Sequence, residues 1–576
     1  MSDLTSYQRD TRRDAWLFWI LALLVIGAGI GLRDPWPADE PRFTLSAKQM
    51  VESGQWLFPH RGIELYSDKP PMLMWLEAAG FELFRNWRVA FLLPSLLASL
   101  GTLWCVVDLG RRLWTRKVGL YAGFALLFAL QFTYQAKKAQ IDPLVTFWIT
   151  LANYGLLRFL LVPRAGDGRH DWRMWALGWF AAGLGTITKG VGVLALVMLL
   201  PAAFATLRGW NGIRMPLRDG WRVVLGPLAF VAAGALWLAP MLGVALSSSD
   251  PAYHRYVQDI LFHQTAGRYA NSWDHSHPPW YYLGVMASMW LPPLLALPWA
   301  LPAWARRLRR RDPRYLLPLA WWLLVVVFFS IPHGKRDVYV MPALVMACLA
   351  LAPLLPGIVR TRGARWIAWV CVAALAVGTA GGGLAMLLGH PSFEARFAVE
   401  RGFEGDPSSI IWLLLAMATW TLGGALWFRR RPVAALLSAL TGLWVLYGVV
   451  AYPLLNPSSS ARGLMTHVGE RIGPRTELGL VGWKEQNLLM ADRPAKTWGF
   501  VLPPHQQLAA AMPWLREQPS RRVLILESVM GPCIDRAHAQ FVGAANRRRW
   551  WLIDATSLRP GCVPPEVKDW RGPDFD

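Results

Sequence analysis

Charged residues are scarce in this sequence. Asp, Glu, Lys and Arg make up 17% of the 576 residues, whereas 54% are hydrophobic and the mean hydropathy is +0.29. This balance excludes a water-soluble protein for most of the chain, because apolar runs of about 18 or more residues recur along it and can span hydrocarbon. Backbone groups in hydrocarbon find no water to bond, so each spanning run must be helical. We therefore predict an all-α polytopic membrane protein.

Acidic residues are the rarer kind of charge, 37 against 59 Lys and Arg, which gives a formal charge of +22. The basic residues gather in the amino-terminal tail and in short loops between apolar runs. Positive charge in such loops marks the cytoplasmic side of a membrane protein and contacts anionic lipid headgroups. The excess needs no nucleic acid partner, and none is expected.

Thirteen apolar segments are predicted to span the membrane. They lie near residues 15–32, 87–108, 118–134, 143–162, 174–188, 190–207, 223–246, 281–301, 315–332, 337–356, 366–388, 410–428 and 433–453. The fifth and sixth share one stretch, interrupted at Lys189, so twelve spans are the alternative. Thirteen is favoured because it puts every basic loop on one side, with the amino terminus in the cytoplasm. These loops hold Arg111, Arg112, Arg116, Lys117, Arg208, Arg214, Arg218, Arg222, Arg306, Arg307, Arg309, Arg310, Arg311, Arg314, Arg429, Arg430 and Arg431.

No small-residue cleavage site of the A-x-A kind follows the first apolar segment, and its apolar core is long for a signal peptide. A cleaved signal is the alternative, but a membrane anchor is favoured.

From about residue 456 the chain lacks any spanning segment. Short strand-like runs occur at 477–482, 522–526 and 550–553, separated by helical or turn segments. We predict a transmembrane domain over 1–455 and a small soluble α/β domain over 456–576. An odd number of spans places this second domain on the outer face.

Cysteine is rare, with five residues in the chain. Cys105, Cys348 and Cys371 lie in or beside apolar segments and are interpreted as small apolar packing residues. Cys533 and Cys562 lie in the predicted outer domain, where an oxidising compartment favours a disulfide between them.

The segment 33–86, called loop one below, is long for a connection between spans and carries unusual charges. They are Asp39, Glu40, Arg42, Asp68 and Lys69. Charges against a membrane are costly unless they face water, a partner or a ligand. A solvated helix cap is the alternative for the acidic pair, ahead of an amphipathic helix over 43–55 that could lie flat on the membrane. A weak surface ion pair is the alternative for the second pair.

Three further basic points face the same compartment. Lys189 ends a spanning segment, Arg268 lies in an aromatic-rich loop, and Lys335 and Arg336 occupy a short turn between spans. A single Lys at a helix end usually extends to the interface. Together, these cations indicate a pocket for an anionic lipid headgroup. Carboxylates would be superfluous for lipid retention alone, so their presence favours catalysis.

Four motifs carry a resemblance to a known family. ADEPRF and SDKPPMLMW in loop one, TKG near residue 189 and HGKRDVYVMP near residue 336 resemble bacterial polyprenyl-phosphate-dependent membrane glycosyltransferases. Within these, the chain looks most like the lipid A aminoarabinose transferases and more distantly like the protein O-mannosyltransferases. The resemblance covers about residues 10–455 and implies a GT-C fold.

The resemblance also implies roles for single residues. Asp39 matches the acidic residue at the reaction centre, with Glu40 beside it as a second catalytic candidate. Lys69, Arg268 and Tyr339 match positions that hold the donor phosphate. The supporting residues would be Arg42, Asp68, Lys189 and Lys335.

Two positions depart from the pattern. Asp68 stands where aminoarabinose transferases often have Glu, and Phe43 where they often have Tyr. The shorter acid bears on any divalent metal near the site, with His60 and His263 as further candidates. A divalent metal is therefore left open as an alternative, but no tight ligand spacing demands one, and none is assigned.

The implied reaction is the inverting transfer of a sugar, such as 4-amino-4-deoxy-L-arabinose, from undecaprenyl phosphate to lipid A or another envelope acceptor at the periplasmic face of the inner membrane. A cationic lipid A product would link the protein to polymyxin resistance. A protein O-mannosyltransferase-like enzyme is one alternative. A polyprenyl-lipid flippase is another, but no internal repeat of the transporter kind is visible.

Overall fold

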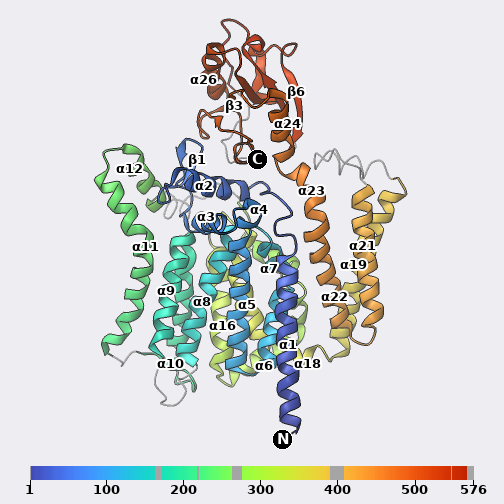
Figure 1. The fold of residues 1–576 in the computed structure, drawn as a ribbon. Coiled ribbons are helices and arrows are strands. Elements are labelled where there is room, and N and C mark those ends of the chain that lie inside the picture. Colours follow the sequence, from blue (N-terminus) through green and yellow to red (C-terminus); the bar gives the residue numbers. More distant parts are fainter. Residues whose placement is uncertain are drawn as a thin grey trace.

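The computed structural model describes residues 2–161, 171–216, 220–262, 276–389, 408–546 and 548–566. These residues form a bundle of helices with a small mixed sheet and its own helices at one end (Figure 1). Helix α1 (Ser2–Gly27) begins at the opposite end of the bundle and leads up to loop one.

Seven helical segments of the described residues are long and apolar enough to cross a membrane. They are Trp87–Leu113, Ile141–Leu161, Gly220–Ser247, Pro313–Ser330, Arg362–Leu387, Ser408–Trp427 and Pro432–Ser459. Two bent pairs, Arg116–Leu127 with Leu130–Ala136 and Tyr281–Met289 with Pro293–Arg309, bring the number to nine if each pair is one span. The chain is thus an integral membrane protein with several spanning helices.

The other predicted spans fall on helices that are shorter or less apolar. These are α1, α9 (Trp172–Lys189) and the apolar stretches Val191–Leu207 and Asp337–Leu351. The total of thirteen spans therefore stays a prediction.

The bundle contains α5 (Leu93–Leu113), α6 (Arg116–Leu127), α7 (Leu130–Ala136), α8 (Ile141–Leu161), α11 (Leu225–Ser247), α16 (Pro313–Ser330) and α17 (Met341–Leu351). Small residues let α8 and α9 pack closely, because a Cβ atom on Gly155 would lie only 2.7 Å from the amide nitrogen of Gly178. Close approach through small residues is the usual way in which helices associate in membranes.

Loop one forms a layer across one end of the bundle (Figure 1). It contains α2 (Glu40–Ser53), the hairpin of β1 (His60–Arg61) and β2 (Glu64–Leu65), and α3 (Met72–Phe84), and the short α4 (Trp87–Ala90) follows it directly. Helix α2 matches the helix predicted over 43–55, but both of its faces are covered. Phe43 and Met50 pack in the core of the bundle, whereas Leu45 packs in the core beneath the sheet. The helix is therefore held between the two parts of the molecule.

The carboxy-terminal part contains a five-stranded sheet in the order β4-β3-β5-β7-β6. Its strands are β3 (Leu478–Val481), β4 (Ala495–Lys496), β5 (Arg522–Leu526), β6 (Gln540–Ala545) and β7 (Arg548–Ile553), with β3 parallel to β4 and β5, and β7 antiparallel to β5 and β6. Leu524 packs on one face of the sheet, and Val523 and Ile525 pack on the other. This alternation buries both faces beneath helices that include α24 (Arg462–Ile472), α25 (Glu485–Leu489) and α26 (Pro504–Glu517).

Cys533 and Cys562 are joined in a disulfide in the structure. Cys105 and Cys348 are buried in the bundle core. The boundary between the two domains near residue 455 stays a prediction.

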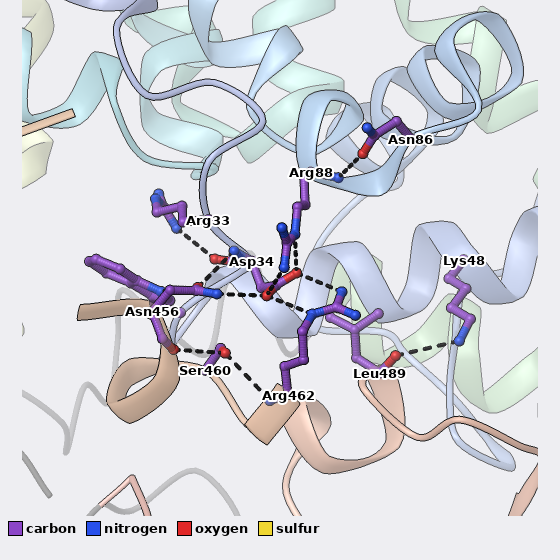
Figure 2. A network of polar contacts seen from close by, with 10 residues as sticks. Arg33, Asp34, Lys48, Asn86, Arg88, Asn456, Ser460, Arg462 and Leu489 are labelled. Atoms are coloured by element: carbon purple, nitrogen blue, oxygen red, sulfur yellow. Dashed lines mark hydrogen bonds and ion pairs between the residues drawn. The ribbon is translucent and has the colours of Figure 1, made fainter. Parts of the chain in front are cut away.

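A buried carboxylate joins the bundle to the sheet region (Figure 2). Asp34 is 1% exposed and accepts hydrogen bonds from Arg88 Nε at 2.9 Å, Arg462 Nε at 2.7 Å and Asn456 Nδ2 at 2.8 Å. Such a charge is tolerated inside a protein only when its oxygens are paired. These four residues, called the Asp34 junction below, fix the start of loop one to α4, to α23 (Tyr452–Ser459) and to α24.

Candidate active site

A cavity of about 520 Å³ lies among the helix ends beneath loop one. Its polar lining includes Asp68, Lys69, Asp142, Lys189, Lys335, Arg336 and Tyr339. Its apolar lining includes Val145, Leu194, Trp237, Leu238, Trp321 and Val325. A mostly apolar cavity with a few convergent charges is typical of a site for an amphiphilic ligand.

Asp39 occupies the N-cap position of α2, but its side chain makes no capping hydrogen bond. It accepts instead from Arg336 Nη2 at 3.1 Å and from Gln140 Nε2 at 3.3 Å. Arg336 lines the cavity, so Asp39 lies at the edge of that space. The alternative of a solvated helix cap does not describe what this carboxylate does.

The surroundings of Asp39 favour its ionised form. Burial raises the pKa of the carboxyl, whereas the positive charges of Arg336, Arg42 and Lys189 lower it. The lowering by these charges outweighs the effect of burial, so the pKa of Asp39 lies below its usual value. A nearby opposite charge has this effect because it stabilises the anion. Asp39 is therefore a carboxylate at neutral pH.

Lys189 forms the second charged contact of the site. Its Nζ pairs with Asp142 in the first turn of α8 and lies 4.9 Å from the ring centroid of Tyr339. Gly190, with a φ of 72°, ends α9 directly after it. Asp142 was not among the residues predicted from the sequence. An acid just ahead of Pro143 at the start of a predicted span needs a partner, so its position in the sequence already indicated a role.

Lys69 reaches the cavity from the segment before α3. Its Nζ donates to the backbone carbonyl of Asp68 at 2.9 Å, and Pro71 is the N-cap residue of α3. The Asp68 carboxylate lies 3.8 Å from Arg61 Nη1. The pair is thus part of a larger network and not a simple surface ion pair.

Lys335 lines the cavity, yet it is only 2% exposed and its Nζ donates to the carbonyl of His277 at 2.9 Å. This contact braces the turn between α16 and α17 that also carries Arg336 and Tyr339. Arg268 lies outside the described residues.

The carboxylate of Glu40 binds groups outside the cavity. It is 5% exposed, accepts from Arg33 Nη2 at 2.7 Å, and also accepts from the amides of Trp36 at 2.8 Å and Ala139 at 3.0 Å. It does not line the cavity of the described residues. These contacts fix the beginning of α2 against the segment that leads into α8.

Arg42 does not line the cavity of the described residues, and its Nε lies 3.0 Å from Glu485 Oε1 in the carboxy-terminal part of the chain. No group of three or more His, Cys, Asp or Glu side chains in the described ranges is arranged to hold a metal ion. His60 lies in β1, and His263 lies outside those ranges.

This chain is similar to known glycosyltransferases. A family model described as dolichyl-phosphate-mannose-protein mannosyltransferase matches residues 68–237, a range that includes Lys69, Asp142 and Lys189. The undecaprenyl phosphate-alpha-4-amino-4-deoxy-L-arabinose arabinosyl transferase of Pseudomonas aeruginosa is 28% identical over 527 residues, which cover 86% of this chain and 89% of the relative. The chain is related to the aminoarabinose transferases. The enzyme of the same name from Pectobacterium carotovorum is 31% identical over 385 residues, 65% of each chain.

The fold agrees with this relationship. The crystal structure of an aminoarabinose transferase, ArnT from Cupriavidus metallidurans, bound to undecaprenyl phosphate, has a TM-score of 0.71 and 18% identity. The match covers 95% of this chain and 99% of that chain. The chain thus has the aminoarabinose transferase fold from the bundle through the carboxy-terminal sheet, and the resemblance seen in the motifs is confirmed.

Proposed function

We propose that the protein is an inverting glycosyltransferase that moves 4-amino-4-deoxy-L-arabinose from undecaprenyl phosphate to lipid A or another envelope acceptor. The ionised Asp39 at the edge of a cation-lined cavity carries this proposal. The names of the relatives supply the donor and the sugar, because a fold by itself does not define a reaction.

The proposed topology has thirteen spans, a cytoplasmic amino terminus and a periplasmic carboxy-terminal domain over 456–576. The basic turn between α5 and α6 supports it, because this turn lies at the end of the bundle where α1 begins, away from the sheet (Figure 1). Loop one and the cavity then face the periplasm, in the inner membrane of a bacterial cell.

In the proposed donor complex, Lys69 and Tyr339 bind the phosphate, together with Arg268. Lys189, fixed by Asp142, adds positive charge from α9. The apolar wall of the cavity fits the first part of a prenyl chain. When the bond between the anomeric carbon and the phosphate oxygen breaks, its electron pair leaves on the phosphate, and these cations stabilise the growing charge.

Asp39 acts on the acceptor side in this account. If the acceptor is a hydroxyl group, Asp39 takes its proton as the oxygen attacks the anomeric carbon from the face opposite the leaving phosphate. If the acceptor is a phosphate, it is already anionic, and Asp39 orients it or supports positive charge on the sugar. Glu40, catalytic in the sequence-based prediction, is proposed here to position loop one through Arg33.

A protein O-mannosyltransferase-like activity is the second candidate, favoured by the family model that matches residues 68–237. It would use the same donor-phosphate cations and a hydroxyl acceptor, so Asp39 would be the general base. A flippase would need no carboxylate at the reaction centre.

The test is reconstitution of purified protein in liposomes that contain undecaprenyl phosphate aminoarabinose and lipid A on the accessible leaflet. The proposal predicts an aminoarabinosylated lipid A. Liposomes with dolichyl- or undecaprenyl-phosphate mannose and a Ser/Thr-rich peptide test the second candidate. A flippase would form neither product, and that result would contradict both transferase assignments.

A further inference from the structure

One residue of the carboxy-terminal domain contacts two arginines of loop one. Glu485, at the start of α25, is 3% exposed, and its Oε1 lies 3.0 Å from Arg42 Nε and 3.6 Å from Arg61 Nη1. Arg42 lies in α2 and Arg61 lies in β1, the next element of loop one along the chain. A single buried carboxylate therefore faces two cations from one loop.

Arg61 extends this contact toward the cavity. It is 7% exposed, its guanidinium lies 4.0 Å from the ring centroid of Phe500 and 5.1 Å from that of Tyr66, and Nη1 lies 3.8 Å from Asp68 Oδ2. Buried arginines of this kind keep one geometry because stacking and ion pairs fix the guanidinium plane. Asp68 is followed directly by Lys69, which lines the cavity.

Arg42 extends the contact in the other direction. It lies three residues after Asp39, at the first turn of α2, and its positive charge is one of those that keep Asp39 ionised. Glu485 thus lies between one arginine that acts on Asp39 and another that leads to Lys69.

The hairpin of loop one docks on the same surface of the carboxy-terminal domain. Glu64 Oε2 accepts from the amide of Val501 at 3.2 Å, and a Cβ atom on Gly62 would lie 3.0 Å from the ring of Trp483. Gln49 Nε2 donates to the carbonyl of Gly62 at 2.8 Å, which ties the hairpin to α2. The contacts of Glu485 are therefore part of a continuous, closely packed interface.

We propose that Glu485 is a positioning residue of the active site, through which the carboxy-terminal domain sets the geometry of Asp39 and Lys69. It acts through Arg42 on the acceptor side and through Arg61 and Asp68 on the donor side. This inference rests on the proposed function. The carboxy-terminal domain then contributes to the geometry of the active site, because one carboxylate holds both the acceptor side at Asp39 and the donor side at Lys69.

The test compares Glu485→Gln with Glu527→Gln in the reconstituted transfer assay. Gln keeps the size of Glu and an oxygen that can accept from Arg42, so the variant should fold. Glu527 is a matched control, because it lies in the same domain and also pairs with two arginines, Arg549 at 3.0 Å and Arg536 at 3.6 Å. We expect Glu485→Gln to remain folded at the assay temperature, although its melting temperature falls, and to lower kcat/KM at least about tenfold, whereas Glu527→Gln should stay within about threefold of wild type.

A double-mutant cycle separates positioning from a general loss of stability. If Glu485 acts through Arg42, the double variant Glu485→Gln with Arg42→Gln should be less impaired than the product of the two single effects. Multiplicative effects, full activity in Glu485→Gln, or an equal loss in Glu527→Gln would each overturn the proposal.

If Glu485→Gln does not yield folded protein, Arg61→Lys tests the donor side. This change keeps the charge but loses the planar guanidinium, and we expect a raised donor KM with kcat nearly unchanged. An unchanged donor KM contradicts the proposal. Absence of transfer by the wild-type protein would contradict the proposed function, whereas an active wild type with an equally active Glu485→Gln would contradict only the positioning role.

Discussion

Asp39 and Arg336 form an ion pair of 3.1 Å between residues that are 297 positions apart in the sequence. The contact joins the start of α2 to the turn between α16 and α17. Through it, the carboxylate of loop one lies beside the same cavity as Lys189 and Tyr339. The proposed reaction centre is thus assembled from separate parts of the chain, and its charge state depends on this contact.

The ion pair predicts a shift in the pH dependence of transfer. Arg336 stabilises the anion and lowers the pKa of Asp39, so Arg336→Gln should raise that pKa toward or above its usual value. On acidification, the variant then loses the activity that needs ionised Asp39 at a higher pH than the wild-type protein does. We expect the acid limb of the kcat/KM profile to move to higher pH. Arg360→Gln, at an exposed position, is the control, and an unmoved acid limb in Arg336→Gln would contradict the assignment.

Donor binding should depend on Lys69. Lys69→Ala removes a cation proposed to hold the donor phosphate, so we expect the apparent donor KM to rise about tenfold or more. Steady-state transfer at varied donor concentration measures this change. Lys496→Ala, which changes an exposed Lys in β4, should leave the donor KM unchanged. Equal donor KM values for Lys69→Ala and wild type would exclude Lys69 from the phosphate site.

The Asp34 junction predicts a pH-dependent contribution to stability. Burial raises the pKa of Asp34, but its hydrogen bonds with Arg462, Arg88 and Asn456 lower it to about 2. Because the folded pKa lies below the unfolded value, the stabilisation is complete above about pH 4 and is lost as pH falls toward 2. The shift corresponds to about 2 kcal/mol.

The variant Asp34→Asn should therefore melt at a lower temperature than wild type at pH 7, and the difference should shrink below about pH 4. Thermal unfolding in detergent across this range measures it. Asp492→Asn removes an exposed ion pair with Arg493 and should change the melting temperature little. A difference between Asp34→Asn and wild type that stays constant down to pH 2 would contradict the role of the ionised carboxylate.

The disulfide predicts a thiol count. Denatured, unreduced protein should present three reactive thiols, from Cys105, Cys348 and Cys371, because Cys533 and Cys562 are joined. After reduction, all five should react. Alkylation followed by intact-mass measurement distinguishes the two states, and five alkylated thiols before reduction would refute the pairing.

Several features of the site could be predicted from the sequence because charged residues beside membrane-spanning segments are costly and therefore rare. Charges such as Asp39, Lys69 and Lys189 lie next to apolar segments, and the structure brings all three to one cavity or its edge. Asp142 is another such residue and could have been found in the same way. The amphipathic pattern also predicted α2, but it could not show that both faces of this helix are covered.

Other features could not be predicted, because their partners are distant in the sequence. Arg462 reaches Asp34 across 428 positions and Glu485 reaches Arg42 across 443, and no local pattern specifies either pair. Glu40 looked equivalent to its neighbour Asp39, yet the helix turns its side chain toward Arg33 and away from the cavity. Spanning segments were also hard to count where helices bend, by 71° in one pair and 96° in another.

The most direct test of the proposed function is a mass spectrum of lipid A from cells that carry wild-type protein or Asp39→Asn. A Glu52→Gln strain is the control, because Glu52 lies on the same helix with its side chain 60% exposed. We predict an aminoarabinose increment on lipid A in the wild-type and Glu52→Gln strains and its loss in Asp39→Asn, with equal amounts of protein in the membrane. The same increment in the Asp39→Asn strain would contradict the central role of Asp39.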